Sequence, residues 1–145
     1  MSESTGGAAS WNDNVIAEFR AGKQRVGGMF DRSALLLLHT TGARSGQRRT
    51  SPVAYFAFDG QFVIVASAAG RDANPAWYFN LLANPEVTIE RWHDDAIESV
   101  TAIAVPAEGA ERDRHWAKIT SLAPGFADYQ TKTSRQIPVI VLKRL

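Results

Sequence analysis

The sequence predicts a mainly β protein with flanking helices (α+β), in which about six antiparallel strands form a barrel or sheet and helices pack outside it. Three observations predict this class. Short apolar runs typical of strands recur along the chain, an Asp-Gly pair joins two of them as a hairpin would, and the helical segments do not alternate one by one with strands. The chain of 145 residues has the length of one domain, which we assign to residues 10–145.

The N-terminal part predicts one helix. Residues 1–9 are small and polar, which favours disorder, and Ser10 with Asp13 resembles a capping box for a helix over about residues 11–21. Apolar and charged residues fall on opposite faces of this helix, and Gly22 would end it. We interpret it as a helix that covers the core. Contact with a membrane surface is the alternative, which the modest basic charge disfavours.

The remaining elements follow from apolar periodicity and from turn residues. Asn74 and Pro75 would open a helix over the segment AWYFNLLA, and another helix is predicted over about residues 107–122. Residues 124–133 read as a polar loop, either a lid or a plain connection. The predicted strands cover residues 35–40, 52–58, 61–66, 86–92, 96–105 and 137–143.

An arginine-rich turn separates the first two predicted strands. Residues 32–58 contain four arginines and no Asp or Glu, although the net charge of the chain is only +1. Gly42 and Gly46 would let backbone amides converge on an anion, beside Ser45 and planar guanidinium groups that bind phosphate oxygens in pairs. The turn therefore predicts a phosphate site, with an exposed basic hairpin tip as the alternative. The arginines in or next to the turn are Arg44, Arg48 and Arg49.

Several classes of function are disfavoured by what the sequence lacks. There is no Walker loop and no GxGxxG, which argues against ATP and against Rossmann-type NAD binding. Zero cysteines and three histidines without metal-ligand spacing predict no metal site. One basic segment on a chain of net charge +1 is a small footprint for nucleic acid. The longest apolar run is too short to cross a bilayer and no signal peptide is present, which predicts a cytoplasmic protein.

Three stretches resemble the deazaflavin-dependent nitroreductase family, which comprises split β-barrel oxidoreductases that use coenzyme F-420. The resemblance implies a split β-barrel and an 8-hydroxy-5-deazaflavin cofactor that carries a phosphate and an oligoglutamate tail. It also implies hydride transfer from the reduced cofactor to electron-poor acceptors: enones, coumarin-type lactones, quinones or nitro compounds. The stretches, in the family's order and spacing, are LLLLHTTGARSGQRRTSPVAYF, VASAAGRDANPAWYFNLLANPEVTIE and PGFADYQTKTSRQIPVIVL.

The same resemblance implies site residues. Tyr129 would be the catalytic group, as proton donor or as the residue that orients the substrate, and it would share the substrate pocket with Phe126. Phe126 stands where a nitroimidazole-activating relative has tyrosine, which argues against that activity here. Ala68 stands where that relative has a lysine, so the arginines would carry more of the affinity for the anionic tail. The cofactor-binding residues implied are Arg44, Ser45, Gly46, Arg49, Pro52, Ser67, Ala68, Ala76, Trp77, Tyr78 and Asn80.

Two alternatives stay open from the sequence. One is a flavin mononucleotide-dependent reductase on the same barrel, because a phosphate site does not separate one ring system from the other. The other is a carrier that binds a planar ligand without turning it over. The sequence also leaves open whether the protein is a monomer or a homodimer, and whether the N-terminal helix makes peripheral contact with the inner face of the membrane.

Overall fold

The computed structural model describes residues 7–26, 30–58 and 60–145. Six antiparallel strands close into a barrel in the order β3-β4-β5-β8-β7-β6, which confirms the predicted fold class. Sequence neighbours pair as hairpins, and the last strand inserts between β5 and β7. The barrel strands are β3 (Leu35–Thr41), β4 (Arg48–Phe58), β5 (Gln61–Val65), β6 (Glu86–His93), β7 (Ala96–Pro106) and β8 (Val139–Arg144).

Strand β3 is apolar on both faces because both faces are covered. Leu36 and Leu38 belong to the cluster that fills the barrel. Leu35 and Leu37 alternate with them and pack on the outer side, in a cluster with Phe19 of the N-terminal helix. This double burial explains why the run reads as continuously hydrophobic instead of alternating.

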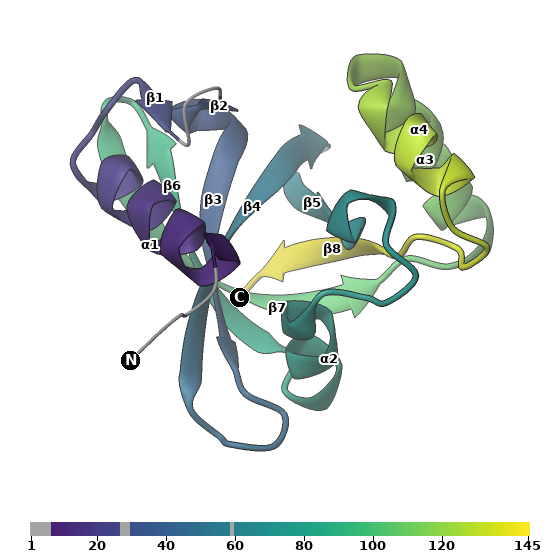
Figure 1. Ribbon diagram of the computed structural model, residues 1–145, viewed down its shortest axis with the longest axis horizontal. Coiled ribbons are helices and arrows are strands. Elements are labelled where there is room, and N and C mark those ends of the chain that lie inside the picture. Colours follow the sequence, from purple (N-terminus) through teal and green to yellow (C-terminus); the bar gives the residue numbers. More distant parts are fainter. Residues whose placement is uncertain (1–6, 27–29, 59) are drawn as a thin grey trace.

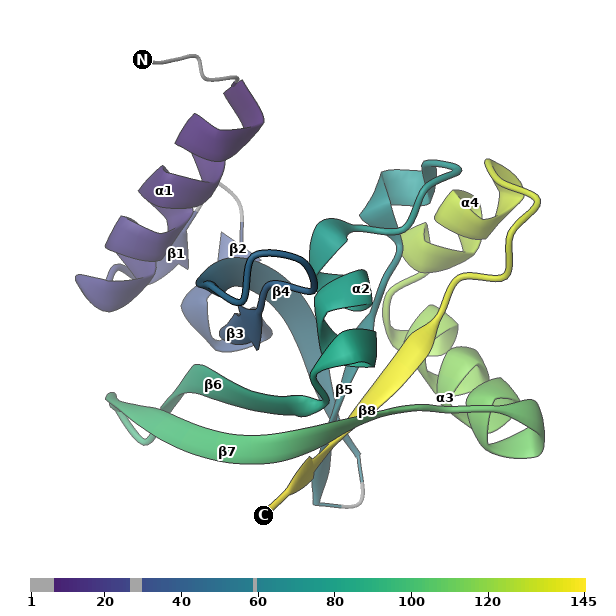
Figure 2. The ribbon, with the colours of Figure 1, turned by 90° about the horizontal axis from the view of Figure 1, so that it is seen from below.

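The helices cover two opposite sides and one end of the barrel. Helix α1 lies on one side, and α3 and α4 lie together on the opposite side (Figures 1 and 2). Helix α2 lies beside the β3–β4 hairpin. Within the described residues, no helix combines the length and apolar character needed to cross a membrane. The helices are α1 (Gly7–Arg20), α2 (Ala76–Ala83), α3 (Gly109–Leu122) and α4 (Gly125–Thr131), with 3-10 turns η1 (Arg32–Ala34) and η2 (Ala68–Gly70).

Two local predictions about helices are wrong. Helix α1 begins at Gly7, so Ser10 lies inside it and cannot start a capping box. The alanines before Ser10 favour helix and extend it toward the N-terminus. Residues 1–6, which carry most of the segment predicted to be disordered, lie outside the described residues. The predicted polar loop at 124–133 is largely helix α4, whose only apolar signal is a pair of aromatic residues three positions apart.

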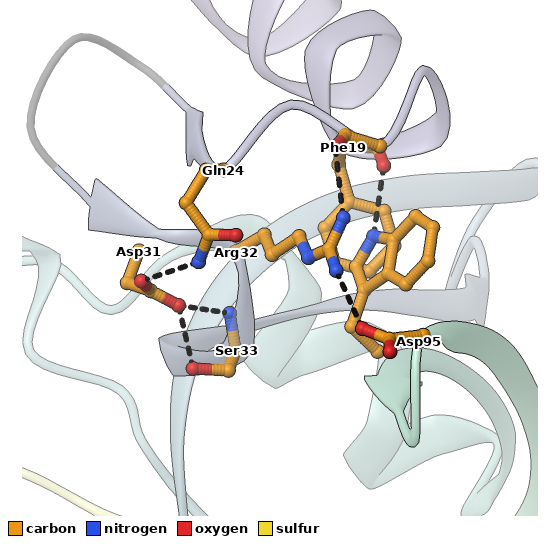
Figure 3. Close-up of polar contacts among 8 residues, drawn as sticks. Phe19, Gln24, Asp31, Arg32, Ser33 and Asp95 are labelled. Carbon is orange, nitrogen blue, oxygen red and sulfur yellow. Dashed lines mark hydrogen bonds and ion pairs between the residues drawn. The ribbon is translucent and has the colours of Figure 1, made fainter.

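A small two-stranded sheet and a polar cluster attach the N-terminal part to the barrel. The sheet pairs β1 (Arg25–Val26) with β2 (Phe30–Asp31), and neither strand is predicted from the sequence. Arg32 donates to the carbonyl of Gly22 at 2.8 Å and lies 4.1 Å from the ring centroid of Trp92 on β6. Figure 3 shows Arg32 donating to Asp95 in the β6–β7 turn. It also shows the neighbouring Asp31, which accepts hydrogen bonds from Gln24 and from Ser33. These contacts link α1 to the β6–β7 hairpin.

Candidate cofactor and substrate site

The turn between β3 and β4 closes on its own backbone. The amide of Gly42 donates to the carbonyl of Gln47 at 2.7 Å, and the amide of Gly46 donates back to Gly42 at 2.9 Å. The amide of Gln47 donates to the hydroxyl of Ser45 at 3.1 Å. The amides of Gly42, Gly46 and Gln47 close the turn, so these three do not converge on an anion as the sequence predicted for the turn. The guanidinium groups beside the turn remain as anion ligands.

Helix α2 fixes the position of this turn. Asn80 accepts a hydrogen bond from the amide of Ala43 at 3.0 Å and donates to the hydroxyl of Thr40 at 3.2 Å. Asn84, at the end of the helix, donates to the carbonyl of Thr41 at 3.3 Å. The hairpin and the helix therefore form one unit. The predicted role of Asn74 as the cap of α2 is wrong, since its side chain makes no cap bond.

Only one of the three arginines lies in the turn itself. Strand β4 begins at Arg48, four residues earlier than the sequence predicts, so Arg48 and Arg49 are strand residues and Arg44 remains in the turn. Successive side chains of a strand point to opposite faces. Arg49 accordingly lines the same groove as Arg44, whereas Arg48 lines a separate polar groove with His39.

The first groove, which we call the hairpin groove, is a basic hollow of about 740 Å³ between the β3–β4 turn and α2. Arg44 and Arg49 are both exposed there. The residues that line it, all in the described part of the chain, include no Asp or Glu. Two unopposed cations in one groove suit a ligand with several negative charges. The lining residues are Gly42, Ala43, Arg44, Ser45, Arg49, Thr50, Ser51, Ala76, Trp77, Phe79 and Asn80.

A second groove of about 510 Å³, the aromatic groove, adjoins the first. Both are lined by Trp77, and successive parts of β4 line them, with Ser51 in the hairpin groove and Pro52 in the aromatic one. Five of its lining residues are aromatic, and such side chains suit a planar ring. The lining residues are Trp11, Asn12, Phe30, Pro52, Val53, Ala54, Val65, Ser67, Ala68, Ala69, Arg71, Pro75, Trp77, Phe126 and Tyr129.

The loop between β5 and α2 lines the aromatic groove in an uncommon backbone conformation. Ala68 and Ala69 have φ of +48° and +55°, followed by Gly70 at +83°. A left-handed conformation costs a residue with a side chain roughly 1–2 kcal/mol. A Cβ on Gly70 would lie 2.8 Å from the carbonyl oxygen of Tyr129, so the loop packs directly on α4. Clustered strain of this kind is typical of functional sites.

Most of the residues that the resemblance implies come together in the two grooves. Two do not: Gly46 shapes the turn with φ of +69° and lines the groove of Arg48, and Tyr78 packs against the barrel core. The hairpin groove collects Arg44, Ser45, Arg49, Ala76, Trp77 and Asn80, and the aromatic groove collects Pro52, Ser67, Ala68, Trp77, Phe126 and Tyr129.

Sequence reasoning missed several residues of the aromatic groove. Trp11 and Phe30 come from the N-terminal part, and no local pattern places them beside α4. Arg71, which adds a cation to this groove, directly follows the loop of left-handed residues. Its position in the quoted stretch VASAAGRDANP was the available signal, but a single arginine in a polar loop is usually a solvated surface residue.

A buried polar chain runs from the hairpin groove toward α1. His39 is only 5% exposed, and its Nδ1 lies 2.9 Å from the hydroxyl of Thr50, while its Nε2 lies 2.5 Å from Glu90. Burial lowers the pKa of His39, although the hydrogen bond to Glu90 opposes this effect. Burial would raise the pKa of Glu90, but hydrogen bonds from His39 and Arg20 outweigh it and the pKa is lowered. A neutral imidazole that donates from Nε2 to an ionised Glu90 fits both directions.

Residues 11–144 match the model of the F420H(2)-dependent quinone reductase family. The chain belongs to this family. It is 41% identical over 110 residues to the F420H(2)-dependent quinone reductase Rv1261c of Mycobacterium tuberculosis, covering 75% of this chain and 72% of that one. It is 35% identical over 108 residues to the putative F420H(2)-dependent quinone reductase Rv3178 of the same organism, covering 74% and 87%. Membership of the F420H(2)-dependent quinone reductase family confirms the predicted family, the oxidoreductase class and coenzyme F-420 as the cofactor.

Solved structures agree with this family. An F420-H2 dependent reductase (FDR-A) is 37% identical with a TM-score of 0.65, covering 76% of this chain and 94% of that one. A structure described as a domain-swapped dimer is 32% identical with a TM-score of 0.68, covering 94% and 100%. The heme storage protein HutZ of Vibrio cholerae has a TM-score of 0.59 at 16% identity, covering 90% of this chain and 87% of that one, which shows a shared fold only.

Proposed function

We propose that this protein reduces quinones, using the reduced deazaflavin coenzyme F-420 bound across the two adjoining grooves. The observation that carries the proposal is their junction at Trp77. A basic groove continues into an aromatic one, as a polyanionic tail attached to a planar ring would require. The names of the relatives, as F420H(2)-dependent quinone reductases, support the choice of acceptor. Enones, coumarin-type lactones and nitro compounds are further acceptors of the same electron-poor character.

The residues of the hairpin groove would hold the charged end of the cofactor. Arg44 and Arg49 would bind the phosphate and the oligoglutamate carboxylates, and the hydroxyl of Ser45 would add a hydrogen bond. Asn80 would act indirectly, because its amide already fixes the turn through Ala43. The electrostatic part of this binding is exposed and should weaken as salt is raised.

The residues of the aromatic groove would hold the ring and the acceptor. When bound, the reduced deazaflavin supplies a hydride from its C5, and a quinone that takes this hydride and one proton becomes a quinol. Trp77 and Pro52 would line the ring, and Phe126 would limit access of water. Tyr129 would donate a hydrogen bond from its phenol to a quinone oxygen, and would pass a proton there or orient a water that does.

The test is oxidation of the reduced coenzyme by a soluble naphthoquinone, followed by absorbance under anaerobic conditions with purified protein. We expect a saturable rate well above the rate without enzyme, and no comparable rate with reduced flavin mononucleotide. Tight binding of the coenzyme without any acceleration would favour the carrier. A rate with flavin alone would move the protein to the flavin-dependent class.

We further propose a peripheral contact of α1 with membranes, where quinones with long apolar tails reside. Trp11 on α1 is 45% exposed, which supports the proposal. Sedimentation with anionic vesicles checks it, and protein that stays in the supernatant at every lipid concentration would contradict it. Size-exclusion chromatography of the purified protein with light scattering distinguishes a monomer from a homodimer.

A further inference from the structure

Arg135 lies between α4 and β8, and the residues lining the two grooves do not include it. Its guanidinium nevertheless bonds to the β5–α2 loop through all three nitrogens. Nη1 donates to the carbonyl of Ala66 at 3.2 Å and Nη2 to that of Ser67 at 2.8 Å. Nε donates to the carbonyl of Arg71 at 2.8 Å, and Nη1 also donates to the side chain of Asn74 at 2.6 Å. One side chain thus gathers four acceptors from residues 66–74.

We propose that Arg135 is a positioning residue, which holds the β5–α2 loop in the shape that receives the deazaflavin ring. The proposal rests on the cofactor assignment made above. The loop needs such support because Ala68 and Ala69 are left-handed and Gly70 follows them. Strained backbone persists only where surrounding contacts fix it. Arg135 bonds to the carbonyls on both sides of this strained turn.

The backbone around Arg135 is itself held in place by hydrogen bonds to α4. Gln130 on α4 donates to the carbonyl of Arg135 at 2.7 Å and accepts from the amide of Ile137 at 3.0 Å. Thr133 donates to Asp72 of the loop at 2.9 Å. The segment after α4 is therefore braced on its own helix and extends across to the loop.

The two segments that Arg135 connects both line the aromatic groove. Helix α4 contributes Phe126 and Tyr129, and the β5–α2 loop contributes Ser67 and Ala68. A guanidinium that joins them fixes the loop relative to α4 and thereby the shape of this part of the groove. Arg135 therefore acts on ring binding without touching the ring.

Lysine cannot replace this arginine. The four acceptors are arranged around a planar fork, and an ammonium at one point reaches only some of them. Arg135→Lys keeps the charge and loses the fork, whereas Arg135→Met keeps the apolar stem and loses both. The two variants separate geometry from charge. Arg114→Met, at an exposed position of α3, is the control for removing one arginine.

The experiment is a fluorescence titration of the full chain with two probes: oxidised coenzyme F-420, and a truncated 8-hydroxy-5-deazaflavin that lacks the phosphate and the tail. We expect Arg135→Met to raise the Kd of both probes by the same factor, about tenfold or more, and Arg135→Lys to give a smaller rise of both. Arg49→Ala should raise the Kd of the intact coenzyme alone. Arg114→Met should change neither.

Hydrogen exchange supplies a second readout. We expect faster amide exchange across residues 66–74 in Arg135→Met while β3 and β6 keep their protection. A Kd of Arg135→Met for the truncated probe within about twofold of the wild-type value would overturn the proposal. Amide exchange that rises equally throughout the barrel in this variant would also overturn it. If Arg135→Met does not fold, Arg135→Lys decides by the same criteria. Wild-type protein that binds neither probe would contradict the cofactor assignment, and the exchange data would still decide whether Arg135 holds the loop.

Discussion

Arg48 and Arg49 are consecutive residues of β4, yet they line different grooves, Arg49 with Arg44 and Arg48 with His39. We expect Arg49→Ala to raise the Kd of coenzyme F-420 about tenfold or more, as loss of a charged hydrogen bond would, and Arg48→Ala to raise it less than about twofold. Both variants remove one charge from the same strand, so general electrostatic attraction is matched. Fluorescence titration at low and moderate salt measures the two constants, and equal losses would contradict the separation of the grooves.

The sequence predicted the barrel well because its strands are short apolar runs joined by recognisable turns. It placed the start of β4 wrongly, since polar residues from Arg48 onward look like a continued turn when the strand extends beyond the core. The hairpin groove was accessible to sequence reasoning because its cations lie within one short segment. The contribution of Trp11 and Phe30 to the aromatic groove was not, because it depends on the packing of the N-terminal part against the barrel.

Gly70 and Gly46 both have positive φ, but they differ in the space around them. A Cβ on Gly70 would lie 2.8 Å from a backbone oxygen, whereas one on Gly46 would meet nothing within 4 Å. We expect Gly46→Ala to lower the free energy of unfolding by about 1 kcal/mol and Gly70→Ala by about 3 kcal/mol or more. Urea denaturation measures both. A similar cost at the two positions would mean that the contact with α4 yields easily.

Arg32 connects α1 to the β6–β7 hairpin through the carbonyl of Gly22 and the indole of Trp92. Its side chain is only 18% exposed, while that of its ion-pair partner Asp95 is 96% exposed. We expect Arg32→Met to lower the free energy of unfolding by about 2–4 kcal/mol, through the lost bond to Gly22 and the lost cation–π contact with Trp92. Asp95 has a left-handed φ of +62°, which Asn tolerates as Asp does. Asp95→Asn therefore removes only the exposed ion pair and should cost less than about 1 kcal/mol. Urea denaturation of both variants tests this ranking, and a larger loss in Asp95→Asn would reverse it.

His39 should make stability depend on pH. Burial lowers its pKa in the folded protein, so between the unfolded value of about 6.5 and the folded value only the unfolded chain binds the proton. Its contribution to stability is therefore complete above about pH 6.5 and is lost as pH falls, with a slope of at most about 1.4 kcal/mol per pH unit. Glu90, whose pKa is also lowered, acts in a separate and more acidic window, below its usual 4.5.

His39→Gln is the matched variant, because a glutamine amide can donate to Glu90 and accept from Thr50 without titrating. We expect urea denaturation at about pH 7.5 and 5.5 to show a smaller loss of stability in the variant than in the wild type. An equal loss in both proteins would assign the pH dependence to other groups.

Tyr129 is the residue of the aromatic groove whose phenol we propose to act in quinone reduction. Its ring packs edge-on against Phe126 at 5.8 Å between centroids, and its backbone carbonyl lies against Gly70, so both its ring and its backbone are packed. Tyr129→Phe removes only the phenol oxygen and should leave the Kd of the coenzyme within about twofold of wild type. If the phenol donates to the quinone oxygen as negative charge develops there, kcat should fall about tenfold or more. Steady-state kinetics with a naphthoquinone measures kcat. An unchanged kcat in Tyr129→Phe would assign the proton to water. Phe126→Tyr, the reciprocal variant, adds a phenol next to position 129. It should not restore the rate in the double variant unless the two positions share one acceptor oxygen.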